Sequence, residues 1–229
     1  MLSAMRVISW NLLRLEGAAA HDVAALIERE KPDLLLMQEV TQHMDVLPSM
    51  APGHYHRLPW PGRIHGLATW SRHHFAQPQI LPLPASSLPG RLPRRRSQIV
   101  KVGDITFANV HLSHGQLLNR RQLLRIAGAL RGQPSAIIGD YNAVGPSLIP
   151  GFADVGPREP THFGSNIVPF RLDRCLAHCL SCTFTSTLDF GPSDHKPIVL
   201  DLQVASARAR RDPLYQARRR LVKIRAALR

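Results

Sequence analysis

Several kinds of residue are scarce in this 229-residue sequence, and each scarcity narrows what the protein can be. Only three cysteines occur, all between Cys175 and Cys182, which argues against a disulfide framework and suits a reducing compartment. No apolar run approaches the roughly 20 residues that a membrane-spanning helix needs. The first residues lack a basic segment followed by an apolar core, so we expect no signal peptide and a cytoplasmic location.

Acidic residues are also scarce. Asp and Glu number 16 against 29 Lys and Arg, which gives a formal net charge of +13. The excess is concentrated in residues 205–229, where nine basic residues accompany one acid. We therefore expect one domain over residues 1–204 and a basic, arginine-rich tail over residues 205–229. Three interpretations of the tail stay open: a disordered arm, an amphipathic helix on an anionic membrane surface, or an arm that binds nucleic acid.

The remaining composition, 44% hydrophobic and 20% charged, is typical of a globular domain with a sizeable core. Short apolar segments predict strands at residues 6–11, 33–39, 66–71, 97–102, 105–112, 135–140, 170–176, 181–187 and 197–204. Helical periodicity predicts helices at 18–29 and 119–131, whereas Pro, Gly and His make 42–61 irregular and 77–96 loop or edge structure. The first strand, helix and second strand form a β-α-β unit with parallel strands.

Polar side chains follow the ends of these strands. In Ile137-Ile138-Gly139-Asp140-Tyr141-Asn142, two branched apolar residues end a buried strand, glycine permits a sharp turn, and an acid and an amide project from the loop. The same arrangement recurs elsewhere, and the whole set comprises Asn11, Glu39, His111, Asp140, Asn142, Asp194 and His195, with Asp173 close behind. Carboxylate and amide oxygens suit a hard cation such as Mg²⁺ or Mn²⁺, and histidines can neutralise phosphate or move protons. Such a set is what in-line hydrolysis of a phosphate ester requires.

The order of these motifs carries a family resemblance over about residues 5–204. Ser9-Trp10-Asn11, Gln38-Glu39, Val110-His111-Leu112, Gly139-Asp140-Tyr141-Asn142, Arg171-Leu172-Asp173 and Ser193-Asp194-His195-Lys196-Pro197 resemble the motifs of the endonuclease/exonuclease/phosphatase (DNase I-like) superfamily. The resemblance implies an α/β (α+β) fold: a four-layer α/β sandwich of two packed mixed β-sheets flanked by helices. It places the site at one end of the sheets.

The resemblance also implies roles for the polar residues. Glu39 would be the main metal ligand, helped by Asn11 and Asp194, with Mg²⁺ as the cofactor and Mn²⁺ as a substitute. Asp140 would orient or deprotonate the attacking water. The phosphoryl oxygens would be held by substrate-binding residues, namely Asn11, His111, Asn142 and His195, and His111 would also protonate the leaving group. Asp173 would fix the tautomer of His195, and either Asp140 or His195 is the general base.

These features predict a metal-dependent phosphoesterase, foremost a phosphodiesterase or nuclease with nucleic acid as its partner. One alternative is a phospholipid or sphingomyelin-type phosphodiesterase, favoured if the tail binds an anionic membrane surface; another is a non-catalytic nucleic-acid-binding module. No obligate protein partner is inferred. The basic run Arg91, Arg94, Arg95 and Arg96 is either a solvated loop or a phosphate clamp beside the site. Seven further histidines are interpreted as surface residues, namely His21, His43, His54, His56, His65, His73 and His74.

Overall fold

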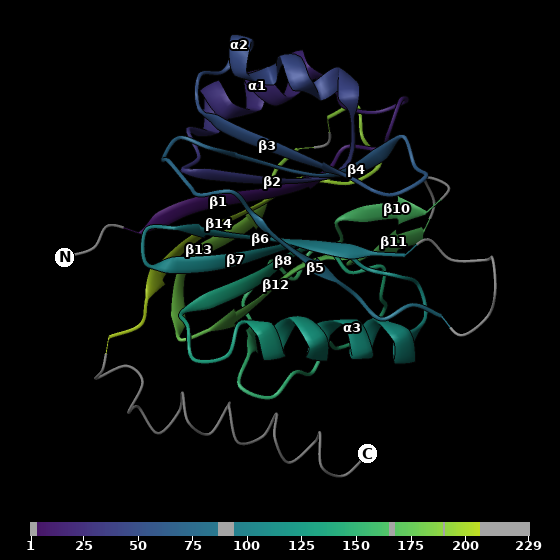
Figure 1. Ribbon diagram of the computed structural model, residues 1–229, viewed down its shortest axis with the longest axis vertical. Coiled ribbons are helices and arrows are strands. Elements are labelled where there is room, and N and C mark those ends of the chain that lie inside the picture. Colours follow the sequence, from purple (N-terminus) through teal and green to yellow (C-terminus); the bar gives the residue numbers. More distant parts are fainter. Residues whose placement is uncertain (1–3, 87–93, 165–167, 190, 207–229) are drawn as a thin grey trace.

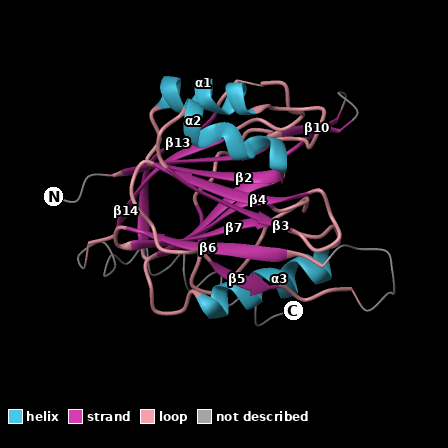
Figure 2. Cartoon of the chain, turned by 45° about the horizontal axis from the view of Figure 1, so that its top comes forward, coloured by secondary structure: helices cyan, strands magenta, loops and turns pink. Residues whose placement is uncertain are grey.

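The computed structural model describes residues 4–86, 94–164, 168–189 and 191–206, and these residues form two β-sheets packed face to face. Helices cover the two outer faces, so the layers run from helix to sheet to sheet to helix (Figure 1). Figure 2 shows the same layers after a turn about the horizontal axis, with the cyan helices on opposite sides of the magenta strands. Each sheet mixes parallel with antiparallel pairs. The predicted four-layer sandwich is confirmed.

The first sheet contains strands from both ends of the described chain, in the order β13-β14-β1-β2-β4-β3. Its strands are β1 (Met5–Asn11), β2 (Leu34–Thr41), β3 (His54–Pro59), β4 (His65–Ser71), β13 (Leu180–Thr187) and β14 (Ile198–Val204). β1 and β2 pair in parallel and are joined by helix α1 (Ala20–Glu30), which confirms the predicted β-α-β unit. α1 packs its buried residues against the outer face of this sheet.

The second sheet has the order β5-β6-β7-β8-β12-β9. Its strands are β5 (Gln79–Pro82), β6 (Arg96–Val102), β7 (Ile105–His111), β8 (Ser135–Asp140), β9 (Ala153–Asp154) and β12 (Asp173–His178). Helix α3 (Gln116–Ala129) joins the parallel strands β7 and β8 and covers the outer face of this sheet. A separate hairpin, β10 (His162–Gly164) with β11 (Val168–Phe170), lies at one end of the sandwich.

The main core lies between the two sheets. Val7 and Leu36 from the first sheet meet Phe107 and Ile138 from the second, and all four side chains are fully buried. The other faces of these strands are covered by the helices, so the central strands are buried on both sides. This double burial is why their sequences read as continuous apolar runs without alternation.

A network of neutral polar side chains also lies between the sheets. Gln38 Nε2 donates to Asn109 Oδ1 at 2.8 Å and to Ser9 Oγ at 3.1 Å. Asn109 Nδ2 in turn donates to the carbonyl oxygens of Met37 (3.1 Å) and Ala68 (3.0 Å). These bonds tie β7 of one sheet to β2 and β4 of the other, beneath the strand ends that carry the charged residues.

Residues 42–61 are more ordered than the sequence predicts. The structure has a 3₁₀ helix η1 (Gln42–Val46), a short helix α2 (Leu47–Met50) and strand β3 within this range. The prediction of irregular structure is wrong here because β3 pairs with β4 along its whole length, and this tertiary pairing overrides an unfavourable composition. The predicted basic tail lies almost entirely outside the described residues. Among the described residues, no helix is both long and apolar enough to cross a membrane.

Candidate active site

Four strand termini bring polar side chains to one end of the sandwich. Asn11 ends β1, His111 ends β7 and Asp140 ends β8. Asp173 begins β12, which runs antiparallel to β8, so that Asp173 pairs with Asp140 in the strand register. Because β7 and β8 are parallel and in register at His111 and Asp140, these two side chains are also neighbours.

Gly139 allows this close arrangement. Its φ is +144°, and a Cβ at this position would lie 2.0 Å from the carbonyl oxygen of Val110 on the neighbouring strand. A side chain would therefore force β7 and β8 apart beside the reactive groups. The interpretation of this glycine as a turn at the strand end is wrong, since β8 continues through Gly139 to Asp140. Its role is close packing within the sheet.

Two other residues adopt positive φ next to the site, Glu39 at +59° and Asn142 at +49°. Glu39 lies at a bulge of β2, where the pairing with β4 shifts between Gln38 and Val40. A bulge re-aims the side chain that it carries, and here the displaced side chain is a carboxylate beside His111.

Asp140 is the centre of the hydrogen-bond network. Its Oδ1 accepts from the backbone N–H of Asn142 at 2.8 Å. Its Oδ2 accepts from Asn11 Nδ2 (3.0 Å) and Asn142 Nδ2 (3.2 Å) and lies 3.4 Å from His111 Nε2. The residue is 1% exposed, and burial raises the pKa of Asp140, while the nearby His195 imidazolium lowers it. The carboxylate is thus held in one orientation by donors.

Asp173 and His195 form a buried pair beside Asp140. Asp173 Oδ2 lies 2.7 Å from His195 Nδ1, and His195 Nε2 lies 4.0 Å from Asp140 Oδ2. Burial alone would lower the pKa of His195, but the carboxylates of Asp173 and Asp140 outweigh it and raise the pKa to about 10. His195 is therefore an imidazolium at neutral pH, wedged between two carboxylates.

His111 has the opposite character. Burial, together with the positive charge of Arg95, lowers the pKa of His111 well below its ordinary value of 6.5. It is therefore neutral at neutral pH. The residue is 4% exposed, and its Nε2 faces Asp140 (3.4 Å) and Glu39 (4.0 Å). Its Nδ1 has no hydrogen-bond partner among the described residues. The site thus contains one charged and one neutral histidine a short distance apart.

All three predicted metal ligands, Asn11, Glu39 and Asp194, offer oxygen atoms suited to a hard cation. Glu39 Oε2 accepts from Arg14, whereas Oε1 accepts no hydrogen bond from the described residues and lies 4.0 Å from His111 Nε2. Asp194 Oδ1 is buried with no hydrogen-bond partner in the part of the chain that the structure describes, and Asn11 Oδ1 accepts a hydrogen bond from the backbone N–H of Leu13. Carboxylate and amide oxygens with free acceptor capacity fit Mg²⁺ or Mn²⁺, so the residues present suit such an ion.

Asp194 lies closer to the histidines than to Glu39. Its Oδ2 is 3.2 Å from His162 Nε2, and the ring centroids of His162 and His195 are 4.5 Å apart. Among the described residues, two groups of His, Cys, Asp or Glu are compact enough to hold an ion: His162, Asp194 and His195, and Asp140, Asp173 and His195. Glu39 belongs to neither group, so the structure does not bring Glu39 and Asp194 into one compact cluster.

Several residues at the site escape the sequence analysis. His162 comes from the β10–β11 hairpin, Arg14 pairs with Glu39 at 3.0 Å, and Trp60 packs against His111 with ring centroids 5.4 Å apart. His65 is 8% exposed beside Trp60, so its interpretation as a surface residue is wrong. Their sequence neighbourhoods show no recurring polar motif, and the antiparallel pairing of β3 with β4 brings the loop that carries Trp60 to the site.

Solved structures of similar fold share this architecture. An endonuclease/exonuclease/phosphatase from Beutenbergia cavernae superposes with a TM-score of 0.69 at 23% identity, covering 90% of this chain and 72% of that one. A mannosyl-6-phosphatase from Bacteroides thetaiotaomicron gives 0.66 at 18% identity, covering 87% and 100%. D. rerio TDP2 in complex with a single-strand DNA product gives 0.69 at 14% identity, covering 88% and 99%. At these identities the likeness establishes the fold.

The sequence itself establishes the family. The model of the Endonuclease/Exonuclease/phosphatase family matches residues 8–195, which span every strand end described above. The chain therefore belongs to this family, whose members act on phosphate esters. No curated protein matches the chain significantly.

Proposed function

We propose that this protein is a divalent-metal-dependent phosphodiesterase that hydrolyses nucleic acid. The observation that carries the proposal is the arrangement around Asp140: an oriented carboxylate, an imidazolium at 4.0 Å from it and a neutral imidazole at 3.4 Å. Hydrolysis of a phosphate ester needs a base for the water, positive charge for the phosphoryl oxygens and further hydrogen-bond donors. Asp140 supplies the base, His195 the positive charge and His111 a hydrogen-bond donor.

Asp140 is the general base in this proposal. It is the acceptor at the centre of the site, and the donors Asn11 and Asn142 fix its orientation. A water that attacks phosphorus gives its proton to Asp140, the bond between phosphorus and the leaving oxygen breaks, and that oxygen takes a proton from solvent. His195 does not serve as the base, because its pKa of about 10 keeps it protonated at neutral pH.

His195 instead binds the phosphoryl oxygens as an imidazolium. Asp173 holds its Nδ1 at 2.7 Å and leaves Nε2 directed towards Asp140 and the reacting group. His111 and Asn142 donate to the same phosphoryl group. Because His111 is neutral, it acts through a hydrogen bond, and we do not assign it the protonation of the leaving group.

We keep Glu39, Asn11 and Asp194 as the residues that would hold the cation, although Glu39 and Asp194 do not belong to one compact cluster of His, Cys, Asp or Glu among the described residues. A divalent ion bound there supplies positive charge for the oxygens that become negative during hydrolysis. The orphaned oxygen of Asp194 and the unbonded Oε1 of Glu39 support this assignment.

Two features support nucleic acid as the substrate. The chain carries a net charge of +13, which favours a polyanion. A protein of the same fold, D. rerio TDP2, is known in complex with a single-strand DNA product. A phosphomonoesterase is a second candidate, favoured by the similarly folded mannosyl-6-phosphatase. The third candidate, a phospholipid or sphingomyelin-type phosphodiesterase, would require the basic tail to bind an anionic membrane surface, and it stays a prediction from the sequence.

The test is hydrolysis of a substrate panel with Mg²⁺ and again with EDTA. The panel contains plasmid DNA, single-stranded DNA, RNA, sphingomyelin liposomes, inositol phosphates and mannose 6-phosphate. Wild type is compared with Glu39→Ala and His195→Ala, and with His43→Ala, an exposed histidine, as the matched control. We expect metal-dependent cleavage of a nucleic acid that the two site variants lose and the control keeps.

Other outcomes would redirect or reject the proposal. Turnover of mannose 6-phosphate or inositol phosphates alone would replace the diesterase by a phosphomonoesterase. Cleavage confined to liposomes would move the substrate to lipid. Full activity in EDTA would contradict the metal requirement.

A further inference from the structure

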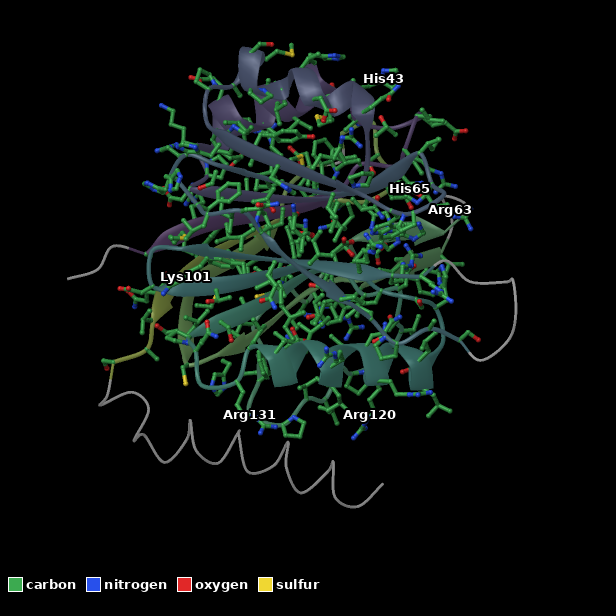
Figure 3. The ribbon with its side chains drawn as sticks, viewed as in Figure 1. His43, Arg63, His65, Lys101, Arg120 and Arg131 are labelled. Atoms are coloured by element: carbon green, nitrogen blue, oxygen red, sulfur yellow. The ribbon has the colours of Figure 1, made fainter. Side chains whose placement is uncertain are left out.

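A second group of buried polar side chains lies beside the proposed catalytic residues and is not used by the mechanism. It consists of Trp60 and His65, around the β3–β4 connection, and Arg95, just before β6. All three are at least nine-tenths buried. Figure 3 labels Arg63 and His65 at the end of the molecule that also carries β10 and β11. Trp60 joins this group to the site, because its ring packs against His111.

Arg95 is the residue that needs an explanation. Its guanidinium lies 4.4 Å from the centroid of the Trp60 ring, and the residue is 8% exposed. Its Nε is buried without a hydrogen-bond partner, and no ion pair joins Arg95 to an acid among the described residues. Burying a cation without a paired anion lowers the stability of the folded protein. Such a residue therefore indicates a role in binding a ligand, because it does not stabilise the fold.

Arg95 is still charged in this setting. Burial lowers the pKa of its guanidinium to about 10, while the carboxylates of Asp140 and Glu39 raise it. These two acids belong to the catalytic site, which places Arg95 within electrostatic reach of the reaction. The 4.4 Å from Arg95 to Trp60 and the 5.4 Å from Trp60 to His111 put the guanidinium within about 10 Å of the His111 ring.

The neighbouring groups favour an anion as the ligand. Trp60 Nε1 and His65 Nδ1 are also buried without hydrogen-bond partners within the described ranges, and burial lowers the pKa of His65. Arg63 adds a further positive charge nearby. Trp60 is 2% exposed, and the Arg95 guanidinium packs over its ring. The ring is therefore not available to stack on a nucleobase. Arg95 therefore has the character of an anchored guanidinium, whose fork of donors matches phosphate.

We propose that Arg95, held over Trp60, is a specificity-determining residue that binds a second phosphate group of the substrate, next to the one that is cleaved. The proposal rests on the proposed function, because the cleaved phosphate is taken to lie at Asp140 and His195. If Arg95 binds a second phosphate, the enzyme should prefer substrates that carry at least two phosphates. Along one strand of B-DNA the axial rise is about 3.4 Å per nucleotide, and neighbouring phosphates are farther apart than this rise because the strand winds round the axis. Such a separation is compatible with the span of at most about 10 Å between the Arg95 guanidinium and the His111 ring.

The test compares ligands that differ by one phosphate. Calorimetry in EDTA, which prevents turnover of a metal-dependent enzyme, measures binding of thymidylyl-thymidine with its single phosphate, and of the same dinucleotide carrying a 5′- or a 3′-terminal phosphate. Inorganic phosphate and pyrophosphate form a second pair and report on small-molecule substrates. The proteins are wild type, Arg95→Met, which keeps the side-chain length and removes the charge, and Arg94→Met, the exposed neighbour, as the matched control.

We expect the extra phosphate to strengthen binding to wild type by about 10- to 100-fold, the range for a charge-assisted hydrogen-bonded pair. Arg95→Met should reduce this ratio to below about 3, and Arg94→Met should keep it. The ratio of kcat/KM for the same dinucleotides with Mg²⁺ should change in parallel. Dependence on Arg95 for the dinucleotides but not for pyrophosphate would identify the polymer as the source of the second phosphate.

An equal loss for one-phosphate and two-phosphate ligands in Arg95→Met would overturn the proposal, because Arg95 would then act on the cleaved phosphate or on the shape of the site. An unchanged ratio would also overturn it. If Arg95→Met does not fold, Arg95→Lys keeps the charge without the planar fork and should lower the ratio by at least about 3-fold. An Arg95-dependent ratio without any hydrolysis by wild type would support the subsite and reject the proposed function.

Discussion

Two buried polar clusters in this molecule lie close together and differ in kind. The first joins the two sheets through neutral amides and hydroxyls, centred on Gln38 and Asn109. The second lies at the strand ends and is charged, with Asp140, Asp173 and His195 packed together. Both are almost inaccessible to solvent, so burial alone does not distinguish a structural cluster from a functional one.

The difference lies in which polar atoms lack a partner. Ten buried side-chain nitrogen or oxygen atoms of the described residues have no hydrogen bond, and seven of them belong to the strand-end site or to the Arg95 group beside it. The intersheet network has one, Gln38 Oε1. Natural proteins leave few such atoms, and each one calls for an explanation. Most of these unpaired polar atoms lie at the strand ends or in the Arg95 group, which indicates that a ligand binds there.

We expect the largest effect, a fall in kcat, from a substitution in the charged cluster. In Asp140→Asn the shape of the side chain is kept and the carboxylate is lost, so no base remains to accept the proton of the water. We expect kcat to fall by about 10²- to 10⁴-fold. Steady-state kinetics on the substrate identified by the panel measures it, with circular dichroism to show that the variant is folded. A loss of less than about 10-fold would transfer the role of base to another residue.

A change in the neutral network should act on stability instead. Asn109→Leu removes the acceptor of Gln38 Nε2 and the donors to two backbone carbonyls. We expect the free energy of unfolding to fall by about 3 kcal/mol, with kcat unchanged at temperatures where the variant is folded. Urea unfolding measures it, and Gln79→Leu on the exposed edge strand β5 is the control, expected to change stability by less than about 0.5 kcal/mol. Loss of kcat in folded Asn109→Leu would show that the two clusters are coupled.

The pH dependence of stability should separate the clusters further. The pKa of His195 is raised from its ordinary value of 6.5 to about 10, so the folded state binds its proton more tightly than the unfolded state. This contribution is fully present below pH 6.5 and is lost as the pH rises through about 10. Gln38, Asn109 and Ser9 of the neutral network do not titrate and contribute no such change.

Urea unfolding at pH 7 and pH 10.5 in EDTA tests this expectation. Wild type should lose more stability than Asp173→Asn over this interval, because the variant lacks the carboxylate that binds the imidazolium. Equal losses in the two proteins would mean that the His195 pair does not hold its proton in the folded state. This is the smallest of the three effects, since other groups titrate over the same range.

The sequence indicated most of the strands because the central ones are buried on both faces and therefore appear as unbroken apolar runs. It also indicated the polar residues at their ends, since Asn11 and Asp140 each close a predicted strand and His111 is the last residue but one of another. It did not indicate β3, whose residues His54–Pro59 have no apolar pattern and form a strand only through pairing with β4. The burial of His65 was missed for the same reason, since that pairing is what buries it.

What the sequence determined by itself is the set of strands with the polar residues at their ends, which follow from apolar periodicity within continuous segments, and the family, whose resemblance in motif order implies the two-sheet sandwich. What only the tertiary structure decided is the state of each group. His111 is neutral and His195 is charged because burial and neighbouring charges differ around two chemically identical rings. Arg94 faces solvent and Arg95 lies on Trp60, although the two are adjacent in the chain. Burial and electrostatic surroundings come from residues distant in sequence, and only the folded chain brings those residues together.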